Sequence, residues 1–144
     1  IFLILSTELI YKLIIYHPYQ SLYLNNIVSK NAKVKYEADY QSLSRADAIR
    51  EIIKDSKNKK NVTIATASWT PLIDGTSIIS SDLKNKIKFI GTANKEKADY
   101  IYTNFFYEVD FRYNNKYEIP DNFYLFKTLY IDDIKVYSIY KKNT

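Results

Sequence analysis

The first sixteen residues form the most apolar stretch of the chain. Residues 1–16 read IFLILSTELIYKLIIY, with only four polar interruptions. Glu8 and Lys12 lie four residues apart, in the order that favours an ion pair along a helix, so the stretch predicts a helix. Because Pro18 disfavours helical geometry at the residue before it, we expect this helix to end at His17.

This predicted helix has two interpretations. It is shorter than the roughly 20 residues that a membrane span needs, and it lacks the basic start and cleavage site of a signal peptide. It is therefore either a helix in the core of the domain or the last turns of a membrane helix that starts before residue 1. The chain has no Met, not even at its start, so we expect a tail of a longer protein. The residues alone leave both interpretations open.

A second helix is expected where polar and apolar positions recur with a helical period. Ser44 is a suitable N-cap, and Asp47 three residues later would complete an acidic capping box. Arg45 falls outside the predicted apolar stripe. The stripe itself consists of Ala46, Ile49, Ile52 and Ile53.

The remaining pattern alternates between strands and short helices. Residues 62–67 (VTIATA) are short, apolar and rich in β-branched side chains, which is typical of a buried parallel strand. A brief helix is expected from Ser80 or Ser81 to Lys86. Further strands are predicted at 34–40, 87–91 and 98–104, followed by a hairpin with arms 124–130 and 135–140 around Asp132-Asp133.

This order of elements predicts the fold class. We expect an α/β fold with a mixed, partly parallel sheet flanked by helices, ending in a β-hairpin and preceded by an N-terminal helix. Residues 1–25 would form the apolar helix and its junction, and residues 26–144 a single soluble α/β domain.

Composition narrows the chemistry. The net charge is +5, but only three of the 21 basic residues are arginine, which is a poor profile for specific nucleic-acid binding. The chain has no cysteine, which excludes disulfides and thiolate chemistry within it. Its only histidine is His17, so a histidine-based metal cluster is excluded as well. We expect no cofactor and no bound metal.

Four residues are candidates for ligand binding. Glu37 and Asp39 share one face of the predicted strand and could form an acid–base pair, or could be solvent-facing partners of lysines. Trp69 follows the 62–67 strand at its carboxyl end, where α/β proteins place binding loops; it could stack on a sugar or anchor the rim of the core. His17 could donate to a lipid phosphate or cap the end of the first helix.

Four segments, in order, resemble the soluble tail of one protein family. They are HPYQ at 17–20 with Tyr23 and Asn25, YEADY at 36–40 with Leu43-Ser44 and Asp47-Ala48, ADYIYTN at 98–104, and IDDIKVYSIY at 131–140. Together they resemble the C-terminal soluble domain of multi-pass glycosyltransferases that use polyprenyl-phosphate sugars, the relatives of dolichyl-phosphate-mannose protein mannosyltransferases. The chain departs from that pattern at Gln41-Ser42, where Trp-Gly is common, and at Asp133, where Gly is usual.

The resemblance implies a membrane protein whose domain lies on the extracytoplasmic face. The domain would be accessory to sugar transfer from a lipid-phosphate donor, as an acceptor-recognition element or a lid. Its partners would be the membrane, through a segment preceding residue 1, the lipid-linked sugar, and a glycan or protein acceptor. The family's catalytic carboxylates lie in the first extracytoplasmic loop, so no residue here inherits them.

Two other hypotheses stay open. The chain could be a free-standing α/β binding or scaffolding domain whose N-terminal helix belongs to its own core. It could also be a small enzyme that uses the carboxylate pair of Glu37 and Asp39.

Overall fold

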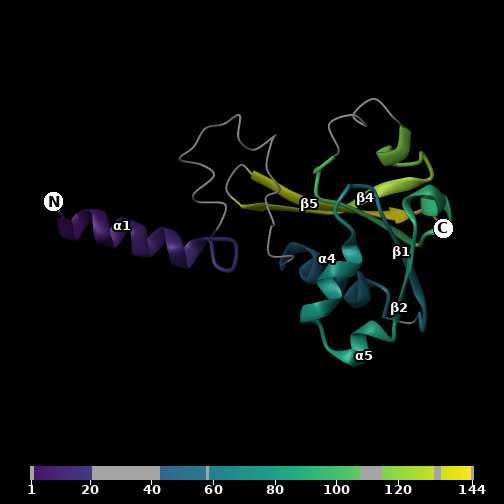
Figure 1. Cartoon of the computed structure of the whole chain (residues 1–144), viewed down its shortest axis with the longest axis horizontal. Coiled ribbons are helices and arrows are strands. Elements are labelled where there is room, and N and C mark those ends of the chain that lie inside the picture. The colour runs from purple at the N-terminus through teal and green to yellow at the C-terminus, as the bar shows by residue number, and fades with distance from the viewer. Residues whose placement is uncertain (1, 21–42, 58, 108–114, 132–133, 144) are drawn as a thin grey trace.

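The computed structural model describes residues 2–20, 43–57, 59–107, 115–131 and 134–143. The predicted fold class is confirmed. A mixed, partly parallel sheet is combined with helices, an N-terminal helix precedes it, and the chain ends in a β-hairpin (Figure 1).

Five strands form the sheet, in the order β2-β1-β3-β5-β4. β1 is parallel to both β2 and β3, whereas β5 is antiparallel to β3 and β4. The strands are β1 Val62–Thr66, β2 Ile87–Ile90, β3 Tyr100–Thr103, β4 Phe123–Ile131 and β5 Ile134–Lys142. All five confirm predicted strands. The strand predicted at 34–40 lies outside the described residues.

Within the described residues, three α-helices and three 3-10 helices accompany the sheet. The α-helices are α1 Phe2–Ile15, α4 Leu43–Asp55 and α5 Ser81–Lys84. The 3-10 helices among the described residues are η1 Leu72–Ile78, η2 Thr92–Lys97 and η4 Asn115–Tyr117. α4 packs against η1 and β5, while α1 projects away from the sheet (Figure 1).

The core lies on both faces of the sheet because strand side chains alternate. On the face covered by α4, Ile64 and Tyr102 join the larger apolar cluster. On the other face, Ala65 and Ile101 join a smaller cluster. The predicted stripe of α4 meets the larger cluster: Ala46, Ile49 and Ile52 are fully buried, and Ile53 packs at its margin.

The predicted cap of α4 is wrong. The helix begins at Leu43, so Ser44 lies within it and is completely buried. The Ser44 Oγ atom lies 3.1 Å from the Tyr102 hydroxyl oxygen, in a hydrogen bond that satisfies two polar atoms inside the core. Asp47 instead accepts hydrogen bonds from the Tyr19 hydroxyl and from Arg50 Nη1.

The prediction that Arg45 faces outward is also wrong. Its side chain is only 4% exposed, and its Nη1 atom lies 3.7 Å from Asp74 Oδ2 of η1. Burial follows from the close approach of η1, which depends on Gly75. A Cβ atom at Gly75 would lie 2.6 Å from Arg45 Cβ and 2.8 Å from the backbone nitrogen of Ala46.

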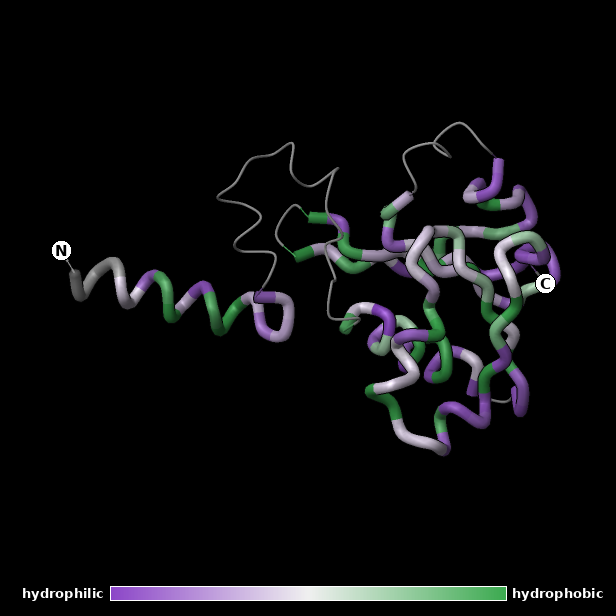
Figure 2. The backbone as a smooth tube through the Cα atoms, viewed as in Figure 1, coloured by the Kyte–Doolittle hydropathy of each residue, from purple (hydrophilic) through white to green (hydrophobic). Residues whose placement is uncertain are grey.

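α1 contributes no described side chain to the core before Tyr16. The exposed apolar side chains are Leu9, Ile10, Tyr11, Leu13, Ile14 and Ile15, at 42–69% exposure. Tyr16 and Tyr19, by contrast, are buried and belong to the larger cluster, so the junction after α1 docks on the domain. Figure 2 shows apolar positions along the projecting helix. Within the described residues, no helix has the length and apolarity to cross a membrane.

Candidate functional site

The carboxyl ends of β1 and β3 form a natural place for a ligand. The chain leaving β1 leads to β2 on one side of β1, whereas the chain leaving β3 leads to β4 and β5 on the other side. In open α/β sheets, the crevice where neighbouring connections diverge in this way is the usual ligand site.

Trp69 stands at this divergence with its ring half exposed, at 53%. The ring stacks on Phe106, with 5.7 Å between the ring centroids and 7° between the ring planes. The backbone N–H of Trp69 also donates to the backbone carbonyl of Phe106 at 2.8 Å. Asn104 Nδ2 donates to Thr70 Oγ1 at 2.7 Å. These contacts join the loops after β1 and β3, so the two rings form a fixed aromatic platform.

A cavity of about 240 Å³ adjoins the platform. Trp69, Ser68, Phe89 and Thr92 are among the residues that line it. Ser68 is 3% exposed, and its Oγ atom has no hydrogen-bond partner among the described residues. A buried hydroxyl without a partner is costly. Because Ser68 Oγ is itself covered by protein atoms, a polar group in the cavity can reach it only after those atoms move.

Of the other predicted site residues, only His17 lies in the described part of the chain, and it does not join Trp69. His17 is exposed at the end of α1, where its Nδ1 atom lies 2.8 Å from Gln20 Nε2. It is not among the residues that line the cavity beside Trp69. Glu37 and Asp39 lie outside the described residues, and the predicted pairing of their carboxylates stays a prediction.

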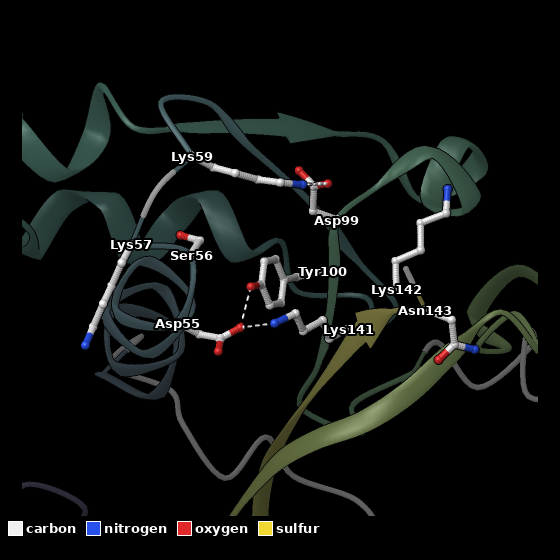
Figure 3. A pocket seen from close by; sticks show the side chains of 9 residues that line it. All are labelled: Asp55, Ser56, Lys57, Lys59, Asp99, Tyr100, Lys141, Lys142 and Asn143. Carbon is white, nitrogen blue, oxygen red and sulfur yellow. Dashed lines mark hydrogen bonds and ion pairs between the residues drawn. The ribbon is translucent and has the colours of Figure 1, made fainter.

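A second site, which the sequence did not predict, lies at the opposite end of the parallel strands (Figure 3). It is a cleft of about 550 Å³ between the last residue of α4, the turn that follows, the start of β3 and the end of β5. Four lysines and two aspartates line it: Lys57, Lys59, Lys141, Lys142, Asp55 and Asp99.

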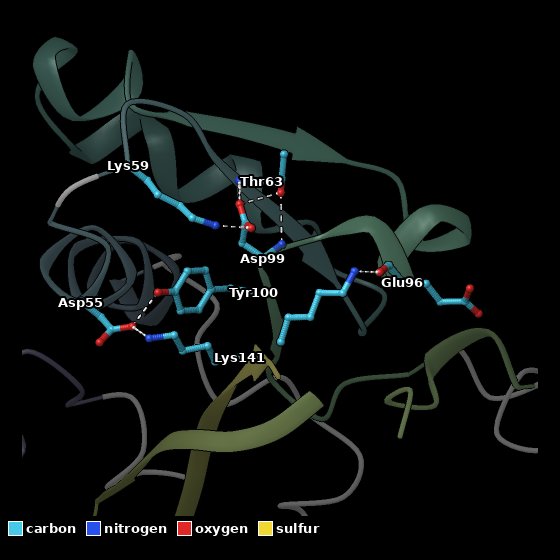
Figure 4. A network of polar contacts seen from close by, with 8 residues as sticks. Asp55, Lys59, Thr63, Glu96, Asp99, Tyr100 and Lys141 are labelled. Atoms are coloured by element: carbon cyan, nitrogen blue, oxygen red, sulfur yellow. Dashed lines mark hydrogen bonds and ion pairs between the residues drawn. The ribbon is translucent and has the colours of Figure 1, made fainter. Parts of the chain in front are cut away.

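Two carboxylates organise this cleft (Figure 4). Asp55 Oδ2 accepts from the Tyr100 hydroxyl at 2.5 Å and from Lys141 Nζ at 2.7 Å. Asp99 Oδ1 accepts from Lys59 Nζ at 2.7 Å, and its Oδ2 accepts from the backbone N–H and the hydroxyl of Thr63, each at 2.9 Å. Each carboxylate therefore binds one lysine. Asp55 connects α4 to β3 and β5, and Asp99 connects the start of β3 to β1.

The pKa values follow from these contacts. Partial burial favours a raised pKa for Asp55, but the hydrogen bonds from Lys141 and Tyr100 outweigh it and leave the pKa below its ordinary value. The same balance, with Lys59 and Thr63 as donors, lowers the pKa of Asp99. Burial and the bond to Asp55 raise the pKa of the Tyr100 hydroxyl, so Tyr100 stays a donor. The pKa of Lys141 is raised by its bond to Asp55, which keeps the ammonium charged.

Sequence patterns could not reveal the cleft, because its residues come from three segments near positions 55, 99 and 141. No group of three or more His, Cys, Asp or Glu side chains in the described part of the chain could hold a metal ion. No protein-family model, curated protein or solved structure shows a significant match to the chain.

Proposed function

We propose that this chain is an extracytoplasmic accessory domain of a membrane glycosyltransferase that draws its sugar from a polyprenyl-phosphate donor. The domain contacts a glycan or protein acceptor, or closes over it, and does not carry out the transfer itself. The ordered sequence blocks support this class of protein. One structural observation carries the choice between it and a free-standing soluble domain, namely the exposure of α1.

The exposed apolar side chains of α1 occupy more than one side of the helix. Ile10 and Ile14 lie on one side, at 57% and 69% exposure, while Leu9 and Leu13 lie a step round the axis at 47% and 42%. Glu8 and Lys12 occupy a further side, so α1 is apolar over most of its surface but not all of it. An apolar helix surface of this width is normally covered by protein core or by lipid. Because the described side chains of α1 are not packed in the core of this domain, we assign the helix to contact with the membrane.

The aromatic platform provides the place for an acceptor. Trp69 offers a flat apolar face that a sugar ring can cover, and stacking on Phe106 fixes its orientation. The Ser68 hydroxyl borders the adjoining cavity and can bond a sugar hydroxyl once the atoms that cover it move. An apolar wall with a few fixed polar groups is the usual composition of a small-ligand site.

Vesicle flotation tests the membrane part. Phosphatidylcholine vesicles are the appropriate probe because they carry no net charge to attract a basic chain. The full chain should float with them, and I10K/I14K, which places two charges on α1, should stay in solution. The control I73K/I78K makes the same change at exposed positions of η1 and should still float. A wild-type chain that does not float, or equal behaviour of the two variants, would contradict the membrane assignment.

Intrinsic fluorescence tests the acceptor site, because Trp69 is the only tryptophan in the chain. Titration with methyl mannoside, methyl glucoside and short mannose oligomers should give a saturable change in emission for at least one sugar. Ser68→Ala keeps the fluorophore and should weaken that sugar by about tenfold, the worth of one buried hydrogen bond. Ser77→Ala, an exposed serine of η1, is the control. An unchanged affinity in the Ser68 variant would remove Ser68 from the site, and no response to any sugar would remove the platform.

A further inference from the structure

We infer that the cleft between α4, β3 and β5 binds a phosphate or diphosphate group carried by a small organic molecule. This goes beyond the proposed function and uses none of the residues that it assigns. It rests on the charge balance of the cleft, on its size and on its place in the fold.

The cleft holds more positive charge than its own carboxylates neutralise. Asp55 is paired with Lys141 and Asp99 with Lys59, each at 2.7 Å. Lys142 Nζ donates to the backbone carbonyl of Glu96 at 2.8 Å, a contact that leaves its charge uncompensated. Lys57 has no hydrogen-bond or ion-pair partner within the described part of the chain. Four lysines against two aspartates leave a surplus of two positive charges on the lining.

This surplus matches a phosphate group better than a carboxylate. A phosphate monoester carries about −1.5 to −2 charges near pH 7, whereas a carboxylate carries one. Lysine is a common phosphate ligand as a point charge, and its flexible stem lets the ammonium follow the anion. Figure 3 shows the Lys57 side chain pointing away from the other lining side chains, so its flexible stem has to turn for the ammonium to meet an anion in the cleft.

The cleft is larger than a single anion requires. At about 550 Å³ it falls within the range of small-molecule sites, roughly 300–1,000 Å³. Tyr100, which is 3% exposed, forms part of its wall, and Lys141 Nζ lies 5.8 Å from the ring centroids of both Tyr100 and Phe126. The remaining volume can take an organic group such as a sugar, with the phosphate near the lysines.

The position of the cleft favours a soluble ligand over a lipid headgroup. The junction after α1 is tied to the first half of α4 by the bond between Tyr19 and Asp47, whereas the cleft begins at Asp55, the last residue of α4. In Figure 1, α1 and the C-terminus lie at opposite ends of the molecule. If α1 contacts the membrane as proposed above, the cleft faces away from it.

Isothermal titration calorimetry of the full chain at fixed ionic strength tests the site, with pyrophosphate and glucose 1-phosphate as probes. Both should bind. K57Q/K142Q should weaken them by about tenfold or more, as expected for loss of charged hydrogen bonds. K57Q alone changes only a turn residue after α4, so it should weaken binding without loss of the fold. K84Q/K88Q is the matched control: it removes the same charge from exposed lysines that do not line the cleft.

The outcomes separate the alternatives. Absence of binding to both probes, or equal losses in the cleft and control variants, would overturn the inference. Acetate that binds as well as the two phosphates would overturn it too. Vesicles of phosphatidylglycerol that bind the wild-type chain but not K57Q/K142Q, with no binding of the free probes, would also overturn the inference, because the phosphate would then belong to a lipid. The calorimetric results depend neither on flotation with phosphatidylcholine nor on Trp69 emission, so the two proposals can fail separately.

Discussion

The two ends of the parallel strands β1 and β3 are joined by different kinds of interaction. At the amino end, the Asp99 carboxylate accepts from the backbone and side chain of Thr63 and from Lys59. At the carboxyl end, the rings of Trp69 and Phe106 stack, and neutral amide and hydroxyl groups bridge the loops. One end is held by charges and the other by packing and uncharged hydrogen bonds.

This difference means that each end should respond to its own set of conditions. Charged contacts weaken when a carboxylate is protonated, whereas ring stacking does not depend on protonation. We therefore expect the stability of the amino end to depend on pH, and that of the carboxyl end to depend on substitutions that alter side-chain packing. Four predictions test this contrast.

The largest effect is expected from acid, because it neutralises Asp55 and Asp99 together. Both have a pKa below the unfolded value of about 3.9. Their contribution to stability is therefore complete above that unfolded value, and it is lost as the pH falls through the lower pKa of the folded state. Urea unfolding between pH 6 and pH 2 should show this loss. D55N/D99N should flatten the acid limb of the curve, whereas D82N/D121N, two exposed aspartates outside the cleft, should not.

Next in size is the effect of Gly75→Ala, which tests packing beside the carboxyl end. The added Cβ would lie within 2.8 Å of Arg45 and Ala46 atoms, so we expect a loss of about 3 kcal/mol in the free energy of unfolding, at the upper end for overpacking. Gly91→Ala is the control, because nothing lies within 4 Å of its added Cβ. Thermal denaturation of both variants measures the difference. Equal stabilities would show that η1 does not need its close approach to α4.

A smaller loss, about 2 kcal/mol, is expected for Asp99→Ala, which leaves the Thr63 N–H without its side-chain acceptor. The loss should be measurable by urea unfolding at pH 7 and should fall in acid, where the wild-type carboxylate is protonated. Asp121→Ala, an exposed change outside the cleft, serves as reference. A loss that is the same at pH 7 and pH 2 would mean that the charge of Asp99 does not hold the amino end.

The smallest effect on stability is expected for Trp69→Ala. The ring is 53% exposed and its main described contact is the stack on Phe106, so the loss should be about 1 kcal/mol or less. It should be equal at pH 7 and pH 4, as measured by urea unfolding. A much larger loss would mean that Trp69 supports the fold and is not an available platform.

Local sequence patterns predicted the elements that depend mainly on their own residues. The β-branched run at 62–67 indicated a buried strand, and β1 is buried because β2 and β3 flank it and α4 covers it. Trp69 was expected in a loop at the end of that strand because polar residues follow the apolar run. Its partner Phe106 could not be predicted, since the stacking depends on how the loop after β3 turns back.

The errors arose where tertiary contacts outweighed a local rule. Ser44 has the residue type and spacing of an N-cap, but the buried Tyr102 hydroxyl needs a partner in the core, and Ser44 supplies it. Arg45 was placed outside from helical periodicity alone, yet η1 covers it because Gly75 permits contact. The cleft combines residues separated by about forty positions, and no local pattern connects them.

The interior position of β5 has a consequence for how the domain folds. β5 pairs with β3 on one side and β4 on the other, although it is the last strand in the sequence. The sheet therefore cannot be completed until β5, which ends at Lys142, has paired with both neighbours. This pairing between segments distant in the sequence favours slow, all-or-none folding. Since Lys141 and Lys142 also line the cleft, a ligand held there would bind only the complete fold and stabilise the domain as a whole, by about 2.7 kcal/mol at a hundred times its Kd.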